Sequence, residues 1–230
     1  MTFADPSLLD LGALFRGADM FDSRDSWRAA GFQIVNRSSS GKIMVARHPS
    51  AHGLLFKRYT NDRSLKDQAE NYESRVEGAR RLRSFVEDHH LSWIAVPRKW
   101  ILELPRSFSR REPSHVLVVE QLDVCSDEQT KATYQRIDPA VLNELCIILY
   151  HFRGMDSNPK NLPFVSDGRI GLIDTEHWDR GSSKSYLHHV REYLASDSLK
   201  IAKKIFRHLE DGDKRRDDFD AEEDTSSSSS

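Results

Sequence analysis

The hydrophobic pattern changes once along the chain, near residue 122, and this change limits the folds that the sequence can adopt. Before it, short apolar runs separated by turn residues indicate strands. After it, apolar residues recur every three or four positions, as they do in helices. Strands gathered in one half of a chain and helices in the other are typical of an α+β fold. The sequence therefore predicts a sheet region followed by a mainly helical region.

The part before residue 122 is expected to form a five-stranded antiparallel sheet and one long helix. The expected strands span residues 31–36, 42–48, 53–59, 99–104 and 115–122. A helix is expected over about 64–88, because apolar residues between Ala69 and Val86 form one stripe. A shorter amphipathic helix is expected over 7–20. The continuous apolar centre of the last strand indicates burial on both of its faces.

The part after residue 122 is expected to be mainly helical. Asp138 suits the N-cap of a helix and Pro139 suits its first position, so a helix is expected from there to about Phe152. Further expected elements are a hairpin with an Asp-Gly turn over 162–174 and helices over 183–195 and 197–209.

The expected organisation is one domain over residues 1–210, with a sheet lobe over about 25–122 and a helical lobe over about 123–210. Residues 211–230 are charged and then rich in serine, with almost no apolar content. Such a composition cannot bury enough apolar surface to order itself, so a disordered tail is expected.

Charge and hydrophobicity exclude several classes of protein. The net charge of -2 gives no support for binding to nucleic acid or to a membrane surface. No apolar run approaches the roughly 20 residues that cross a bilayer. The N-terminal residues lack the basic and apolar regions of a signal peptide, so a cytoplasmic location is expected. Delivery to a host cell by secretion without a signal peptide stays open.

Cysteine and histidine give no sign of a metal site. Cys125 and Cys146 stand beside apolar residues, without a Cys-x-x-Cys pattern, so they are expected to be buried thiols in a reducing compartment. The pair His188 and His189 has no third ligand at a recognisable spacing, so it is expected to be solvated.

Three polar residues carry the main functional signal of the second half. Asn161 follows Asp156 by five positions, and Asp174 ends an apolar run thirteen positions after Asn161. Phosphoryl transfer needs a carboxylate beside the acceptor hydroxyl, and amide and carboxylate oxygens that hold Mg²⁺ against the phosphates. The alternative for Asp156 is a turn cap, a common role of aspartate in such loops.

The order and spacing of these residues resemble the protein-kinase-like superfamily, whose catalytic loop has the same Asp-x-x-x-x-Asn spacing. The resemblance implies a two-lobed kinase-like fold. It also implies that Asp156 is the catalytic aspartate and that Asn161 and Asp174 bind Mg²⁺. The C-terminal lobe would be reduced, because the chain ends at residue 230.

The first half also resembles this superfamily. Gly41 follows a serine run that resembles the loop covering the nucleotide phosphates, and Lys57 resembles the third-strand lysine that pairs with them. The helix after Lys57 offers Glu77 and Glu73 as carboxylate partners for the lysine. Both stay open, although Glu77 stands at the more usual distance in sequence. The alternative for Lys57 is a surface lysine on an edge strand.

The last strand resembles the segment that joins the two lobes of a kinase and binds adenine. The resemblance implies that Val119 is the gatekeeper residue behind the adenine. It also implies that the backbone groups of Glu120 and Leu122 bind the adenine ring.

Three motifs of the sequence differ from those of typical protein kinases, and these differences indicate which members of the superfamily the chain resembles. The phosphate loop has a single glycine, Gly154-Met155 stands where His-Arg is expected, and Asp174-Thr-Glu176 stands for Asp-Phe-Gly. These features resemble small-molecule phosphotransferases, the minimal kinases of bacterial effectors and uncharacterised kinase-like proteins of chlamydia-related bacteria.

The resemblance implies a phosphotransferase that uses ATP and Mg²⁺. Its partners would be the nucleotide and a protein or small molecule whose hydroxyl accepts the γ-phosphate. The chief alternative is a pseudokinase, which keeps the fold as a binding or interaction module without turnover. A third possibility is an α+β domain with no nucleotide site.

Overall fold

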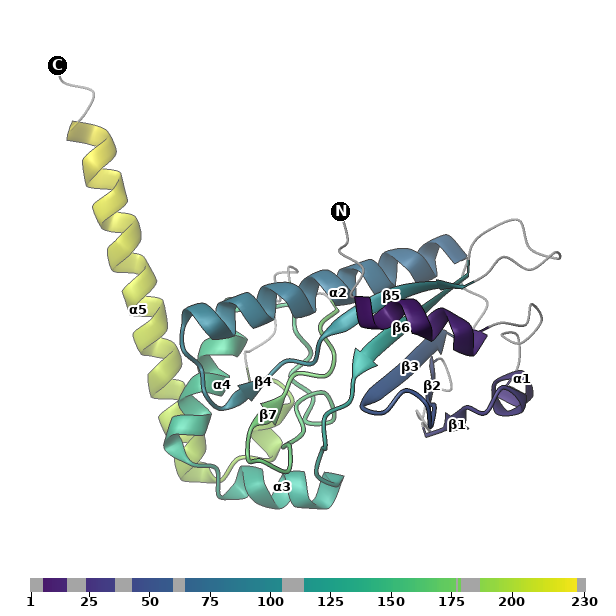
Figure 1. Ribbon diagram of the computed structural model, residues 1–230. Coiled ribbons are helices and arrows are strands. Elements are labelled where there is room, and N and C mark those ends of the chain that lie inside the picture. Colours follow the sequence, from purple (N-terminus) through teal and green to yellow (C-terminus); the bar gives the residue numbers. More distant parts are fainter. Residues whose placement is uncertain are drawn as a thin grey trace. The chain divides into compact units, whose positions relative to one another are not determined.

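The computed structural model of the protein contains two compact units (Figure 1). The described residues are 6–15, 24–35, 43–59, 65–104, 114–176, 178 and 187–226. Unit 1 comprises Met1–Phe85 and Val96–Leu122, and unit 2 comprises Val86–Ala95 and Asp123–Ser230. The mixture of one five-stranded antiparallel sheet with several helices confirms the predicted α+β class.

Unit 1 is built on the five-stranded antiparallel sheet, whose strands lie in the order β1-β2-β3-β6-β5 (Figure 1). The strands are β1 (Gln33–Ile34), β2 (Ile43–Arg47), β3 (Leu54–Tyr59), β5 (Lys99–Leu104) and β6 (Ser114–Glu120). β6 lies between β3 and β5, and its residues from Val116 to Val119 are all buried. The predicted burial of this strand on both faces is therefore confirmed.

Helical elements cover both faces of the sheet. They are η1 (Pro6–Phe15), α1 (Arg24–Ala29) and α2 (Leu65–Asp88), whose last turn belongs to unit 2. On one face, Tyr72 of α2 forms a cluster with Leu117 and Val119 of β6. On the other face, Phe15 and Trp27 belong to a larger cluster that also contains Val116 and Val118 of β6. The alternation of side chains along a strand explains this division.

Two features of unit 1 differ from the sequence prediction. The first strand is shorter than the expected 31–36, because α1 ends at a turn in which Gly31 has φ +88°. Glycine adopts this left-handed conformation without steric cost, whereas it is not compatible with an extended strand. The expected helix over 7–20 is a 3₁₀ helix where the structure describes it, over Pro6–Phe15. α1 was not predicted.

Unit 2 is mainly helical, as the sequence predicts. Its elements are β4 (Ile94–Ala95), α3 (Asp127–Gln135), α4 (Pro139–His151), β7 (Ile170–Gly171), η2 (Val190–Glu192) and α5 (Ser196–Ser226). α4 begins as predicted: the Asp138 carboxylate accepts a 2.8 Å hydrogen bond from the amide of Ala140, and Pro139 occupies the first turn. The predicted hairpin is also present, with Phe164 bridged to Ile170 and Gly168 at φ +89°.

Other parts of unit 2 differ from the prediction. α3 was not predicted, although Ser126 and Gln129 form a capping box at its start. The described part of the expected helix 183–195 contains only the short η2. α5 continues as a helix to Ser226, where a disordered tail was expected from residue 211. Extending an existing helix avoids the nucleation step, and lysine, arginine and glutamate are good helix formers.

The remaining general predictions concern cysteines and membranes. Cys125 and Cys146 are both free thiols, and Cys146 is buried whereas Cys125 is half-buried. Burial raises the pKa of the Cys146 thiol to about 12, so it remains protonated at neutral pH. No helix in the described ranges has the length and apolar character needed to cross a membrane.

Candidate functional site

The loop after α4 holds Asp156 and Asn161 in direct contact. Nδ2 of Asn161 donates a 3.0 Å hydrogen bond to Oδ2 of Asp156, while Oδ1 of Asp156 accepts one from the amide of Asn158. A carboxylate can only accept hydrogen bonds, so the amide nitrogen of Asn161 must face Asp156. The other end of that amide, Oδ1 of Asn161, is thereby left to act as an oxygen ligand.

Asp174 follows a segment that runs beside this loop. The amide of Ile173 donates a 3.0 Å hydrogen bond to the carbonyl of Asn161, and the amide of Gly171 donates a 2.8 Å bond to that of Pro163. Asp174 is half-buried, and its Oδ1 accepts a 3.1 Å hydrogen bond from the amide of Glu176. The structure thus brings Asn161 and Asp174 onto neighbouring segments of unit 2.

α3 holds the loop in place through Tyr134. The fully buried phenol donates a 2.8 Å hydrogen bond to the carbonyl of Leu162, and its ring packs against that of Phe164. Burial raises the pKa of this phenol far above its ordinary value, so it remains a hydrogen-bond donor. Because Leu162 directly follows Asn161, the unpredicted helix α3 fixes the position of the candidate site.

His189 is a neighbour of Asp156 that sequence reasoning did not assign to the site. Its Nε2 lies 3.9 Å from Oδ1 of Asp156, and its amide donates a 3.3 Å hydrogen bond to Oγ of Ser157. The side chains of His189 and Asp156 are 44% and 52% exposed, so solvent reaches both. No local pattern links residues 32 or more positions apart, so the sequence offered no signal for this contact.

Lys57 occupies an inner strand of the sheet in unit 1. It pairs with Val45 of β2 on one side and with Leu117 of β6 on the other, so it does not lie on an edge strand. Its side chain shares a face with Leu55 and Tyr59, two members of the cluster that α2 covers. Lys57 is half-buried there. The alternative of an edge-strand lysine is therefore wrong.

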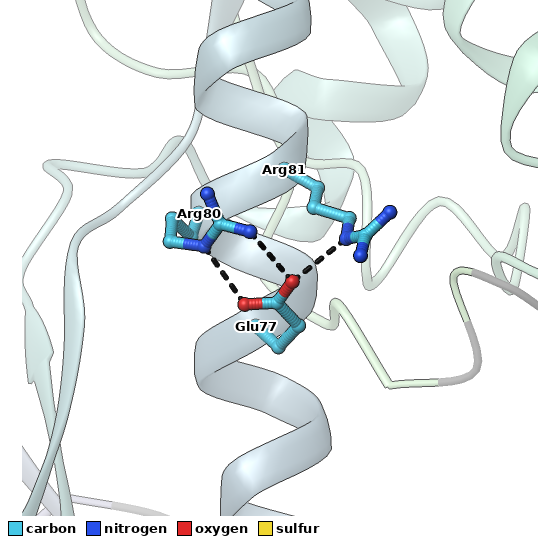
Figure 2. A network of polar contacts seen from close by, with 3 residues as sticks. All are labelled: Glu77, Arg80 and Arg81. Carbon is cyan, nitrogen blue, oxygen red and sulfur yellow. Dashed lines mark hydrogen bonds and ion pairs between the residues drawn. The ribbon is translucent and has the colours of Figure 1, made fainter. Parts of the chain in front are cut away.

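The two candidate carboxylate partners of Lys57, Glu77 and Glu73, both lie on α2. Oε1 of Glu77 accepts 2.7 Å hydrogen bonds from Arg80 and Arg81, and its Oε2 accepts a 2.8 Å bond from Arg80 (Figure 2). These bonds lower the pKa of Glu77 to about 2. Glu73 is exposed. Neither carboxylate is bonded to Lys57 in the described structure.

The predicted adenine-binding segment is the end of β6. Val119 is buried, and the amide of Glu120 donates a 2.9 Å hydrogen bond to the carbonyl of Arg98. Burial raises the pKa of the Glu120 carboxyl, but hydrogen bonds from the backbone and side chain of Arg98 outweigh it and hold this pKa below its usual value. Among the described residues, none accepts a hydrogen bond from the amide of Leu122.

The predicted site residues thus fall into three groups. Asp156, Asn161 and Asp174 lie together in unit 2, whereas the members in unit 1 are Lys57, Glu73, Glu77, Glu120 and Leu122. Gly41, the predicted phosphate-loop glycine, lies outside the described residues.

The unit 2 group provides the ligand chemistry that Mg²⁺ prefers. The amide oxygen of Asn161 and the carboxylate of Asp174 are hard oxygen donors, and Mg²⁺ in phosphotransferases needs only one or two protein ligands besides phosphates and water. The described residues contain no group of three or more His, Cys, Asp and Glu side chains that could hold a metal ion.

Comparison with known proteins gives no family assignment: no protein-family model matches the chain, and no curated protein matches it significantly.

Proposed function

We propose that the protein is an ATP- and Mg²⁺-dependent phosphotransferase with a protein-kinase-like fold. It would transfer the γ-phosphate to a hydroxyl group of a protein or small molecule. The observation that carries the proposal is the hydrogen bond between Asp156 and Asn161, with the segment leading to Asp174 bonded to the backbone of Asn161. This geometry supports separate roles for the three side chains in phosphoryl transfer.

Asp156 is the group that orients the acceptor. Its carboxylate would accept a hydrogen bond from the attacking hydroxyl and take its proton as the new oxygen–phosphorus bond forms and the bond to the departing ADP breaks. The hydrogen bond from Asn161 fixes the direction of the carboxylate. Half-exposure of Asp156 leaves room for an acceptor to reach it.

Asn161 and Asp174 are the residues that would hold Mg²⁺. The cation, when bound, neutralises charge on the phosphate oxygens. Nδ2 of Asn161 is used by Asp156, so Oδ1 of the same amide is the atom that would bind the cation. The one amide side chain would thus connect the proton acceptor to the metal.

The unit 1 residues would bind the nucleotide. The proposal assigns the α- and β-phosphates to Lys57, and the adenine ring to backbone groups at the end of β6. In support, Lys57 lies on the third strand of a sheet and is followed by a long helix, and the amide of Leu122 makes no hydrogen bond to the described residues.

One observation favours the alternative of a nucleotide-binding pseudokinase. The carboxylate of Glu77 is engaged by Arg80 and Arg81 (Figure 2), and the exposed Glu73 is not bonded to Lys57. In an active kinase a helix glutamate pairs with the lysine of the third strand. A module that binds nucleotide without turnover does not need that pair.

ATP turnover and Mg-ATP binding test the proposal together. We expect Lys57→Met, Asp156→Asn and Asp174→Asn each to reduce the release of ADP by about 100-fold or more, because each removes a group that acts on the transition state. Asp197→Asn is the matched control, since Asp197 is 89% exposed on α5 and pairs with Lys200. Release of ADP that is equal in all four variants contradicts the proposal.

Thermal unfolding with and without Mg-ATP separates the two functions. Stabilisation by Mg-ATP that Lys57→Met and Asp174→Asn abolish, together with turnover, supports the phosphotransferase. The same stabilisation without turnover, across hydroxyl acceptors from serine peptides to sugars and choline, supports the pseudokinase. No stabilisation at millimolar Mg-ATP contradicts both.

A further inference from the structure

A cavity of about 310 Å³ lies in unit 2, between the segment around η2 and the first half of α5. Its lining comes from Leu187 and Arg191 on one side and from α5 on the other. The α5 residues from Leu199 to Glu210 lie four, seven, eight and eleven positions after Leu199, so they form one continuous stripe of the helix. None of these residues belongs to the proposed phosphotransferase site.

The floor of the cavity is apolar. Leu187 and Phe206 are 5% and 7% exposed, so both side chains belong to the folded core beneath the cavity. Leu199 is half-buried beside them. An opening that reaches two core side chains offers apolar surface to a ligand without any rearrangement of the protein.

The rim of the cavity is basic. Arg191, Lys203 and Arg207 are exposed, and the described lining residues include one acidic side chain, Glu210, so together these residues carry a formal charge of +2. Lysine and arginine place their carbon chains along apolar surface and keep their charged ends in solvent. The cations therefore surround an apolar floor without filling it.

We propose that this cavity binds a small amphiphilic anion, a molecule with one carboxylate, phosphate or sulfate group on a short apolar chain or ring. The charge of the rim selects the anionic group, and the buried floor selects the apolar part. The volume is at the lower end of the range of roughly 300–1,000 Å³ found for small-molecule sites, so the ligand is a small molecule and not a peptide or a large cofactor.

Decanoate is the probe for the first test, because it combines one carboxylate with a short apolar chain. Titration into the full-length protein, followed by calorimetry and by the NMR signals of leucine methyl groups, should show saturable binding that shifts Leu187 and Leu199. Decyltrimethylammonium has the same chain and the opposite charge, and it should bind at least about tenfold more weakly. Equal binding of the two probes, or no saturable binding of decanoate, overturns the proposal.

Charge reversal on α5 provides the matched variants. Lys203→Glu with Arg207→Glu should weaken the binding of decanoate by about tenfold or more, because two attractions become repulsions. Lys204→Glu is the control, since Lys204 is exposed on the same helix but does not line the cavity. An equal effect of Lys204→Glu contradicts a specific site. All three changes lie at exposed positions, and circular dichroism checks that α5 is retained.

Two further experiments test where the ligand binds and whether it is a soluble molecule or a membrane lipid. Leu199→Trp should fill the cavity and block decanoate while the rim charges remain, and unchanged affinity in this variant contradicts binding on the apolar floor. Vesicles of phosphatidylglycerol provide anionic lipid in a membrane. Binding to the vesicles without binding to monomeric decanoate overturns the assignment of a soluble ligand.

Discussion

Asp156 and Asn161 are joined by a 3.0 Å hydrogen bond from Nδ2 to Oδ2, which closes the loop after α4 on itself. The bond gives one amide two tasks, because its nitrogen orients a carboxylate while its oxygen is left for a cation. The candidate site in unit 2 therefore does not need two separate residues for these tasks.

Asn161→Ala should weaken the binding of Mg²⁺ and misorient Asp156. Loss of a ligand or of its supporting contact typically costs about 10-fold to 100-fold in metal affinity. We expect the Mg²⁺ concentration for half-maximal ADP release to rise by this factor, together with a lower maximal rate. Asn143→Ala, on an exposed position of α4, is the control and should leave both values unchanged. A normal Mg²⁺ titration in Asn161→Ala contradicts the dual role of the amide.

Glu77 should stabilise the protein in a manner that depends on pH. Its folded pKa of about 2 lies below the ordinary 4.5, so its contribution is fully present above pH 4.5 and is lost as the pH falls toward 2. The pairs with Arg80 and Arg81 are largely solvated and screened, so Glu77→Gln should cost only roughly 0.5–1 kcal/mol at pH 7. Urea unfolding at pH 7 and pH 3 measures the difference, which should shrink at the lower pH. An equal cost at both values would show that charge is not involved.

Release of Glu77 from its arginines tests whether it serves Lys57. Arg80→Gln with Arg81→Gln removes both competing partners (Figure 2). If Glu77 then pairs with the lysine, the KM for ATP should fall by roughly twofold to fivefold, the equivalent of one or two helix ion pairs. The gain should vanish on addition of Glu77→Gln and persist on addition of Glu73→Gln. An unchanged KM in Arg80→Gln with Arg81→Gln contradicts the assignment of Glu77 as the partner of Lys57.

Tyr72→Phe should destabilise the contact between α2 and β3. The phenol oxygen of Tyr72 accepts a 3.0 Å hydrogen bond from the amide of Tyr59, and the two rings stack at 5.4 Å. Burial raises the pKa of Tyr72 to about 12, so the hydroxyl is neutral at every pH of interest. Removal of its oxygen takes this hydrogen bond from the buried N–H of Tyr59, which costs about 1–3 kcal/mol.

Thermal or urea unfolding measures the stability that Tyr72→Phe loses. Tyr193→Phe is the control, since Tyr193 is a half-buried tyrosine of unit 2. A loss in Tyr72→Phe no larger than in Tyr193→Phe would mean that water replaces the hydroxyl.

Much of the fold was predictable because its signals are local. Asp138 and Pro139 define the start of α4 by their own side chains, and the Asp-Gly turn defines the hairpin. The capping box of Ser126 and Gln129 is an equally local signal that would have located α3. By contrast, the pairing of β4 with β7 joins two-residue strands 76 positions apart, for example Ile94 with Ile170, and no local pattern predicts it.

The candidate site was predictable where sequence spacing fixes geometry. Five positions are enough for Asn161 to turn back onto Asp156, and the hairpin returns the chain to Asn161. The preference for Glu77 over Glu73 was different, because it rested on distance in sequence alone. Arg80 and Arg81 stand three and four positions after Glu77, which is the spacing of neighbours on a helix surface. Which of several nearby cations a carboxylate such as Glu77 pairs with depends on their positions in the folded structure.

The short strand β4 belongs to unit 2 although most of that unit comes later in the chain. β4 lies between α2 and β5 in the chain, yet it pairs with β7, and Glu144 of α4 accepts hydrogen bonds from the amides of Ser92 and Trp93 just before it. A fragment that began at Asp123 would lose this strand and leave the Glu144 carboxylate without its donors. The helical unit is therefore not one contiguous segment of the chain, because the ten residues Val86–Ala95 belong to it as well.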